Sequence, residues 1–536
     1  MINEIIEKMG KDLFFKIKEF SDILNLDVED AKSILNDGKE KGIFIQTMEN
    51  EFAFKENIAK EIMDTFDVEI SKKYTFGNLK EKRLSLIETH LRDEILQDMA
   101  LKKRDLATEM LVLHIERNNH IYTTRDDKNS EMWIYEDGIY IPEGKSYVKE
   151  YSRKILGAVY TSHFINNVIE KIETDTYIDS NTFFNQNIVD EIPVQNGILN
   201  IHTRELSIFN PRKIFFNKLP ITYDSSSKCP MIEEHFETIL KDKEDAKVMF
   251  ELFGYALLKE NKLEKAFMMV GNGRNGKSKT LELMKKFVGV NNCSALALSS
   301  MNSDSFSLSE LFGRFVNLAG DLSYTDLKDT GMIKQLIGRD EIQSKRKFKT
   351  DLNFVNYSKL IFSTNELPRV YDLTDGFWTK WVLLEFPYKF ISQKEYDSLP
   401  KDQLENKKIM NTDIIEQITT EEEMSGLLNK ALDSLKIILE NKEFSYSKGT
   451  DEVKNLWIRQ SDSFMAFCFD KLEESYDSKI SKKALRKCYL EYCKFHKLKS
   501  TSDKSIKITL ENMFGAIEVR FGDTSNGWEG FKFKQL

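Results

Sequence analysis

Residues 271–278 read GNGRNGKS and fit the pattern GxxxxGK[ST], with glycine, lysine and serine at the required positions. The six residues before them, KAFMMV at 265–270, form an apolar run typical of a buried parallel strand. The segment KTLELMKKFVG, which begins at Lys279, has the spacing of an amphipathic helix. A strand, a glycine-rich loop and a helix in this order predict a phosphate-binding loop in an α/β fold. The alternative is a glycine-rich turn that matches the pattern by chance.

The residue types in this loop match the chemistry of a nucleoside triphosphate. Its glycines let successive backbone N–H groups face a phosphate, and the helix that follows adds its positive amino-terminal end. We expect Lys277 to reach the β and γ phosphates and the Ser278 hydroxyl to bind Mg²⁺. The loop alone fits an ATPase or a GTPase. The expected nucleotide-binding residues are Gly271, Asn272, Gly273, Arg274, Asn275, Gly276, Lys277 and Ser278.

Length and composition exclude several classes of protein. A chain of 536 residues is long enough for three or four domains of about 150 residues each. Hydrophobic residues make up 41% and charged residues 31%, the balance of a soluble globular protein. The five cysteines form no CxxC pair, so the sequence predicts neither a zinc ribbon nor a disulfide framework. Without a signal peptide or a run of ~20 apolar residues, the chain is expected to be cytoplasmic, with no membrane partner.

Two polar residues downstream of the loop each follow a predicted strand. The apolar strand 315–319 ends close to Asp321, whose carboxylate is expected to help Ser278 hold Mg²⁺. The β-run 359–363 is followed by Asn365, an amide that can orient the attacking water and sense the γ phosphate. The alternatives are a solvated acid and a turn-capping asparagine.

The net charge of −9 requires any nucleic-acid contact to come from local basic patches. Residues 334–349 carry six basic side chains against two acids, or +4, and residues 479–499 carry eight against one, or +7. A lysine-rich hairpin can grip phosphates without reading bases, although a solvated charged face is the alternative. The expected DNA contacts are Lys345, Arg346, Lys347 and Lys349 in the first patch and Lys482, Lys483, Arg486 and Lys487 in the second.

Taken together, the segments GNGRNGKS, GDLS, KQLIGRDEIQSKRKFK, FSTNELP and DGFWTKWVLLEFP resemble a superfamily 3 helicase in order and spacing. More narrowly, the chain from about residue 130 onward is similar to the helicase module of phage and plasmid primases and of poxvirus-type primase-helicases. The resemblance implies an AAA+-like ATPase that binds ATP and Mg²⁺, forms rings, usually hexamers, and moves on single-stranded DNA. It also implies roles for Lys277 and Ser278 on the nucleotide, Asp321 on the metal and Asn365 as the sensor.

The sequence departs from this family at three points. Where relatives carry an arginine that reaches a neighbour's γ phosphate, DGFWTKW has Lys380, so either Lys380 or the nearby Arg369 is the expected finger. Leu322 follows Asp321 in place of a second acid, which leaves Asp326 as a candidate base. Only about 130 residues precede the helicase-like region, so we expect no primase domain and a separate primase or polymerase as a partner.

The expected fold is an α/β P-loop core with a mixed α/β domain before it and a winged-helix domain at the carboxyl end. At the amino end we expect a second winged helix, with a helical adaptor as the alternative. We expect the chain to be an ATP-dependent helicase that acts in the replication of a virus, plasmid or integrated element. An origin-binding initiator acting on duplex DNA and a P-loop switch or defence ATPase are the alternatives. The expected divisions are 1–60 (winged helix), 61–130 (helical), 131–260 (α/β), 261–395 (ATPase), 396–455 (helical linker) and 456–536 (winged helix).

Overall fold

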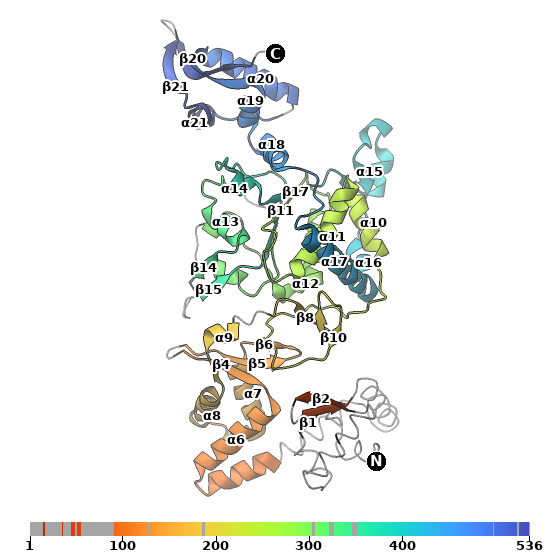
Figure 1. The fold of residues 1–536 in the computed structure, drawn as a ribbon, viewed down its shortest axis with the longest axis vertical. Coiled ribbons are helices and arrows are strands. Elements are labelled where there is room, and N and C mark those ends of the chain that lie inside the picture. The colour runs from red at the N-terminus through yellow and green to blue at the C-terminus, as the bar shows by residue number, and fades with distance from the viewer. Residues whose placement is uncertain are drawn as a thin grey trace. The chain divides into compact units, whose positions relative to one another are not determined.

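The computed structural model of the chain contains two compact units (Figure 1). One comprises Met1–Asn118 and Ser146–Ile172, and the other comprises Asn119–Lys145 and Glu173–Leu536. Before residue 41, where the sequence predicts three short helices, the structure describes only the strand at residues 14–16 and the helical residue 35. The six-part division of the chain stays a prediction. The structure describes residues 14–16, 35, 44–48, 51–54, 90–126, 129–184, 188–302, 306–320, 326–345, 352–496, 498–521 and 525–534.

A small antiparallel sheet and several helices make up the first unit. The pairing of β2 with β3 confirms the hairpin predicted for residues 41–55. A third strand, β1, pairs with β3 and was not predicted. The elements are β1 Phe14–Lys16, β2 Phe44–Met48, β3 Glu51–Phe54, a helical segment at 90–100, α6 Arg104–Asn118 and η1 Gly157–Val159, with α7 Gly144–Leu156 and α8 Ser162–Asp175 crossing into the second unit.

The second unit begins with two sheets. The predicted hairpin around Asp137 and Gly138 is confirmed, and both residues have positive φ, 49° and 93°, as a tight two-residue turn requires. The sequence at residues 193–210 predicts two strands joined by a polar turn, and in the structure these residues contribute to three strands. The first sheet has the order β6-β5-β4-β7, with β4 Ile121–Thr124, β5 Met132–Glu136, β6 Ile139–Ile141 and β7 Tyr177–Ile178; the second has the order β10-β9-β8, with β8 Glu191–Val194, β9 Gly197–Asn200 and β10 Leu206–Ser207.

A five-stranded parallel sheet forms the centre of this unit. Its order is β12-β13-β16-β11-β17, so the strand before the glycine-rich loop lies between two strands that come later in the chain. The predicted strands at 265–270, 315–319 and 359–363 are confirmed within a residue as β11, β13 and β16. The strands are β11 Ala266–Val270, β12 Cys293–Ser294, β13 Val316–Ala319, β16 Lys359–Thr364 and β17 Trp381–Glu385.

Both faces of this sheet are buried, which explains why β11 is apolar at every position. Phe267 and Met269 belong to one hydrophobic cluster, with side chains of α10, α11, α12 and α17. Met268 and Val270 point the other way into a second cluster, with α13, α14 and α18. Figure 1 shows the two sets of helices on either side of β11 and β17. The helices are α10 Pro230–Ile239, α11 Lys243–Leu257, α12 Lys277–Val288, α13 Gly331–Ile337, α14 Asp375–Trp378, α17 Glu421–Asn441 and α18 Thr450–Ser461.

The sequence predicts a helical stretch from Met231 to Leu258, and the structure confirms it as two helices separated by a short break. Leu240 has extended backbone angles, φ −106° and ψ 156°, and its side chain is buried in the core. Helix α10 therefore ends at Ile239, directly before Leu240, and α11 begins at Lys243. Helical periodicity alone gave no sign of the break.

The last part of the chain combines three helices with a three-stranded sheet. The sequence predicted the helices and the strands around the 522–530 turn, and it missed β20. That strand pairs with β22 to give the order β20-β22-β21. The elements are α19 Ser463–Lys471, β20 Leu472–Ser481, α20 Lys482–His496, α21 Asp503–Phe514, β21 Ile517–Phe521 and β22 Ser525–Phe533.

Shorter elements connect these parts. The strands β14 and β15 pair on either side of residues 345–351, which include the last four basic residues of the first basic patch; residues 346–351 lie outside the described chain. Across the part of the chain that the structure describes, no helix has both the length and the apolar character to cross a bilayer. The remaining elements are α9 Ser180–Phe184, η2 Val290–Asn292, η3 Ser300–Asn302, η4 Ser307–Leu311, β14 Glu341–Ser344, β15 Leu352–Val355, β18 Lys389–Ile391, α15 Gln393–Ser398, η5 Lys401–Gln403, β19 Lys407–Ile409 and α16 Ile414–Ile418.

The contact of α11 with α17 depends on a glycine. A Cβ atom on Gly254 would lie 2.3 Å from the Ala431 carbonyl oxygen. This oxygen belongs to the backbone of α17 and cannot move away without distorting that helix. We expect Gly254→Ala to lower the free energy of unfolding by about 1–3 kcal/mol, measured by urea denaturation. Gly376→Ala is the control, because that helical position has no atom within 4 Å of the new Cβ. Equal stability of the two variants would contradict this packing.

Candidate nucleotide-binding site

The loop between β11 and α12 needs glycine for steric reasons that differ along its length. A Cβ on Gly271 would lie 2.2 Å from Asn275 Nδ2 and 2.4 Å from the Phe386 carbonyl oxygen. Gly276, directly before α12, has φ 96°, a conformation that side chains other than glycine rarely adopt. Arg274 has φ 55° although it is not glycine. The loop is therefore tightly turned, as a backbone that curls around an anion must be.

Lys277 lies at the start of α12 and is 4% exposed. Its Nζ donates hydrogen bonds to the Gly271 carbonyl oxygen at 2.5 Å and to Asn275 Oδ1 at 3.1 Å. A third bond, also 3.1 Å, goes to Asn365 Oδ1. The ammonium group is thus held at the mouth of the loop by oxygen atoms from the loop and from the tip of a neighbouring strand.

Asn365 reaches the loop because β16 lies directly beside β11. The two strands are parallel, with Val270 opposite Thr364, so both chains leave the sheet at the same edge. The Asn365 Oδ1 atom also accepts a hydrogen bond from the Gly273 backbone N–H at 3.3 Å. The structure therefore brings together Lys277 and Asn365, two of the residues predicted to act on the γ phosphate.

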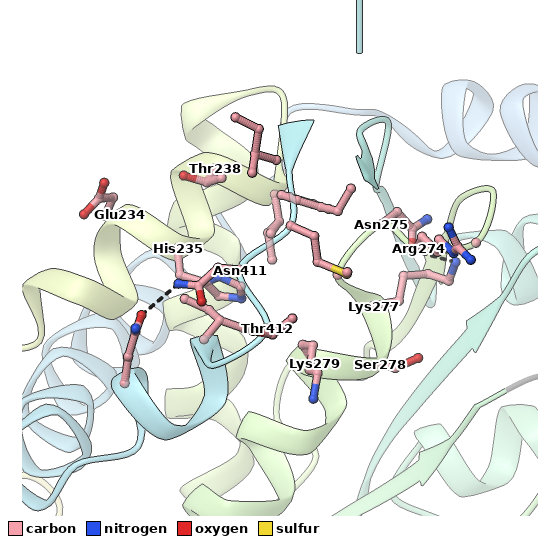
Figure 2. A pocket seen from close by; sticks show the side chains of 18 of the residues that line it. Glu234, His235, Thr238, Arg274, Asn275, Lys277, Ser278, Lys279, Asn411 and Thr412 are labelled. Atoms are coloured by element: carbon pink, nitrogen blue, oxygen red, sulfur yellow. Dashed lines mark hydrogen bonds between the residues drawn. The ribbon is translucent and has the colours of Figure 1, made fainter. Parts of the chain in front are cut away.

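Two cavities flank the loop, and Asn365 lines both of them. The first has a volume of about 610 Å³ and is lined by residues 273–279 on one side (Figure 2). The second, of about 1130 Å³, contacts residues 270–272 and is more polar. Asp326 and Arg369 also line the second cavity, so both lie at the same edge of the sheet as the loop.

The predicted metal ligands are only partly visible. Ser278 is exposed in the first turn of α12 and lines the first cavity. Asp321 lies outside the described residues, but Gly320 directly before it is described at the end of β13. Because Ala319 pairs with Phe362 in the parallel sheet, β13 ends at the same edge as β16. The assignment of Asp321 to Mg²⁺ stays a prediction.

The two candidates for the cationic finger lie in different places. Lys380 precedes β17 at the amino edge of the sheet, and its Nζ is 2.8 Å from Glu264 Oε2. Since Ala266 pairs with Trp381, Lys380 is about five residues, or ~16 Å, along the sheet from the loop of its own chain. Arg369 donates to Thr501 Oγ1 at 2.9 Å and lies 3.5 Å from Asp462.

The predicted candidate base, Asp326, accepts a hydrogen bond from the Tyr371 hydroxyl at 3.1 Å. That bond raises the pKa of Tyr371, together with burial, which is the larger cause. The carboxylate lines the second cavity on the side of the loop that carries Gly271. Its role stays a prediction.

The predicted DNA contacts fall into three groups. Lys345 is exposed at the end of β14, whereas Arg346, Lys347 and Lys349 lie outside the described residues. On α20, Lys482 is paired with Glu518 and Arg486 with Asp503. The remaining two predicted contacts, Lys483 and Lys487, share one exposed helix face with Leu490 and Lys494.

Comparisons with known proteins support a similarity to viral helicase-like proteins. Residues 269–376 match a family of unknown function (DUF5906), and residues 53–243 match a family described as D5 N terminal like. The chain is 25% identical over 327 residues to "Putative helicase L207/L206" of Acanthamoeba polyphaga mimivirus, covering 56% of this chain and 31% of that protein. It is 22% identical over 280 residues to "Putative helicase V13" of Sputnik virophage, covering 50% and 35%.

A third relative is "Putative helicase 121R" of Invertebrate iridescent virus 3, 22% identical over 391 residues, with 67% of this chain and 41% of that protein covered. The chain is similar to viral proteins named as helicases. It spans 31% to 41% of their length. A solved structure of the NrS-1 C-terminal region aligns with 76% of this chain and 96% of that chain at 14% identity, and its TM-score of 0.37 is too low for an argument about the fold.

Sequence reasoning missed the far wall of the first cavity. That wall comes from α10 and from the segment around β19 and α16, two regions to which no motif pointed. In Figure 2, His235, Thr238, Asn411 and Thr412 face the loop residues Asn275 and Lys277 across the cavity. No local sequence pattern identifies these wall residues, because the two segments are about 170 residues apart and meet only in the folded chain.

The position of Asn365 leads to a specific prediction. In Asn365→Asp, a carboxylate would stand 3.1 Å from Lys277 Nζ, where it would bind the ammonium group and repel a phosphate. We expect ATP turnover to fall by about tenfold or more. Asn210→Asp, which makes the same change of charge in the segment after β10, is the control. Turnover that is equally affected in both variants would remove Asn365 from the site.

Proposed function

We propose that this chain is an ATP-dependent, ring-forming DNA helicase of superfamily 3 that moves along single-stranded DNA in replication of a virus or mobile element. The observation that carries the proposal is the meeting of Lys277 with Asn365 at the edge of a parallel sheet, directly after a GxxxxGK[ST] loop. Because the Lys277 ammonium group and the Asn365 amide oxygen lie 3.1 Å apart, both side chains can contact the same γ phosphate. The similarity to viral proteins named as helicases supports the step from nucleotide binding to helicase function.

The phosphates and the metal ion have proposed partners in the loop and at the end of β13. The phosphates lie on the backbone N–H groups of residues 271–278, with Lys277 on the β and γ phosphates. Mg²⁺ is held by Ser278 and Asp321, and it supplies charge neutralisation at the phosphate that is cleaved. The exposed Ser278 hydroxyl at the first turn of α12 fits this role.

The placement of Lys380 favours it over Arg369 as the finger that acts on a neighbouring subunit. In a ring, each interface joins two different faces of the subunit, so a finger must lie on a face other than that of its own loop. Lys380 is at the amino edge of the sheet and meets this requirement, whereas Arg369 lines a cavity beside its own loop. To act on a neighbouring subunit, the Lys380 side chain, which is 16% exposed, would have to leave its ion pair with Glu264.

DNA contacts are proposed at two places. The β14–β15 hairpin carries the first basic patch and would grip the phosphates of a single strand. In the last part of the chain, the order helix, strand, helix, helix, strand, strand supports a winged-helix domain with α20 as the helix that contacts DNA.

ATP turnover with and without single-stranded DNA tests the proposed function. We expect DNA to stimulate turnover in the wild-type chain, and Lys277→Ala to abolish it because the γ phosphate loses its cation. Lys285→Ala is the control, since Lys285 lies on the same helix, is exposed and does not line the first cavity. Turnover without stimulation would favour a P-loop switch, and duplex binding without turnover would favour an initiator.

The ion pairs on α20 predict unequal effects of its lysines on DNA binding. Lys483 and Lys487 have no ion pair within the described chain, whereas Lys482 and Arg486 are paired with acids. We expect Lys483→Ala/Lys487→Ala to weaken duplex binding regardless of sequence and to reduce the salt dependence by about one unit of slope per lost phosphate contact. Fluorescence anisotropy over a range of salt concentrations measures this slope. A larger loss in Lys482→Ala/Arg486→Ala would contradict the assignment.

A further inference from the structure

Three of the exposed apolar side chains of the chain gather on the first cavity. Met231 is 40% exposed, Ile409 is 47% exposed and Met410 is 45% exposed, and all three line the wall opposite the glycine-rich loop. Exposed apolar residues normally occur singly, and a group of them beside a concave site marks a place for an apolar ligand part. Ile239, Phe390 and Ile414 extend the same apolar wall.

The same wall also carries polar side chains, namely Glu234, His235, Thr238, Asn411, Thr412 and Gln417. Asn411 Nδ2 donates to Gln417 Oε1 at 2.8 Å, the bond drawn at the left of Figure 2, and Asn411 Oδ1 accepts from the Asp413 backbone N–H. Each of these amides therefore keeps an N–H and a lone pair for another partner. Ligand pockets combine apolar side chains with placed polar groups that orient the ligand, and this wall offers both kinds.

His235 adds a buried nitrogen to the same wall. Its side chain is 7% exposed, it lines the cavity, and its Nε2 has no hydrogen-bond partner among the described residues. Burial lowers the pKa of His235 to about 4, so the ring is neutral at pH 7. A neutral imidazole can pack against an uncharged ring without adding a further charge to the wall, which already carries Glu234.

The wall is fixed in place by contacts between its two segments. Lys408 Nζ, at the centre of β19, donates to the Thr238 carbonyl oxygen of α10 at 2.6 Å. Behind α10, Lys430 of α17 lies 3.0 Å from Glu233. The two halves of the wall therefore stand opposite the loop as one surface.

We infer that the wall of α10 and residues 409–417 binds the adenine base of the nucleotide whose phosphates the 271–278 loop holds. This inference rests on the proposed function. The loop lines one side of the cavity and the wall lines the other, so a single nucleotide can contact both. Met231, Ile239 and Met410 pack against the ring, while Asn411 and Gln417 face its polar edge.

Adenine fits this wall better than guanine does. An amide side chain offers one donor and one acceptor, which match the N7 and N6 groups of adenine. Guanine presents two acceptors at the same edge and is matched by arginine or lysine. The basic residues that line the cavity, Arg274, Lys277 and Lys279, all belong to the loop side.

Binding measurements separate the base from the phosphates. We would titrate the full chain, with Mg²⁺ present throughout, against ATP, GTP and inorganic tripolyphosphate by calorimetry. We expect Met231→Ala/Met410→Ala to raise the Kd for ATP by about tenfold through lost apolar contact and to leave the Kd for tripolyphosphate unchanged. Ile437→Ala on α17 is the control, because Ile437 is as exposed as Ile409 but does not line the cavity.

A second variant tests the choice of base. We expect Gln417→Ala to reduce the preference for ATP over GTP by about fivefold or more, since the amide that matches adenine is removed. Equal Kd values for ATP, GTP and tripolyphosphate in the wild-type chain would overturn the inference and leave the phosphate site intact. Failure of all three to bind would instead overturn the proposed function. Circular dichroism of each variant confirms that it is folded.

Discussion

The hydrogen bonds around Lys277 Nζ depend on the parallel arrangement of the central sheet. Strands that run in the same direction bring their carboxyl ends to one edge of the sheet. The loop after β11 and the residue after β16 therefore meet although they are far apart in the sequence. An antiparallel partner at this position would have placed Asn365 at the far end of the sheet. The direction of pairing is thus what brings the Lys277 ammonium group and the Asn365 amide together.

Burial on both faces keeps that edge rigid. Helices α10, α11, α12 and α17 cover one face of the sheet and α13, α14 and α18 cover the other. The last of these helices, α18, carries Trp457, which packs on Trp381. The Trp457 Nε1–H group also donates a hydrogen bond to the Pro368 carbonyl oxygen at 2.8 Å. Pro368 is three residues after Asn365, so the sensor segment is anchored to α18. A change at the phosphate site has a short, packed route to the last part of the chain.

Arg369 extends the same connection. Its guanidinium contacts Thr501 and lies beside Asp462, the residue whose side chain accepts from the first N–H groups of α19. Through Asn365, Pro368 and Arg369, one short segment touches the glycine-rich loop, α18 and the start of the last helices. In the proposed helicase, this segment is suited to couple the state of the nucleotide to the domain proposed to hold DNA.

Sequence alone determined the features that depend on neighbours along the chain. The glycine-rich loop, the strands β11, β13 and β16, the Asp137–Gly138 turn and the charge of α20 were all predictable, because loop sterics, apolar runs and turn residues act over a few positions. Tertiary structure decided what depends on distant partners. It broke the 231–258 helix at Leu240, added β20, paired Lys482 and Arg486 with acids, and set α10 opposite residues 409–417. Those outcomes arise from packing between segments far apart in sequence, which no local pattern records.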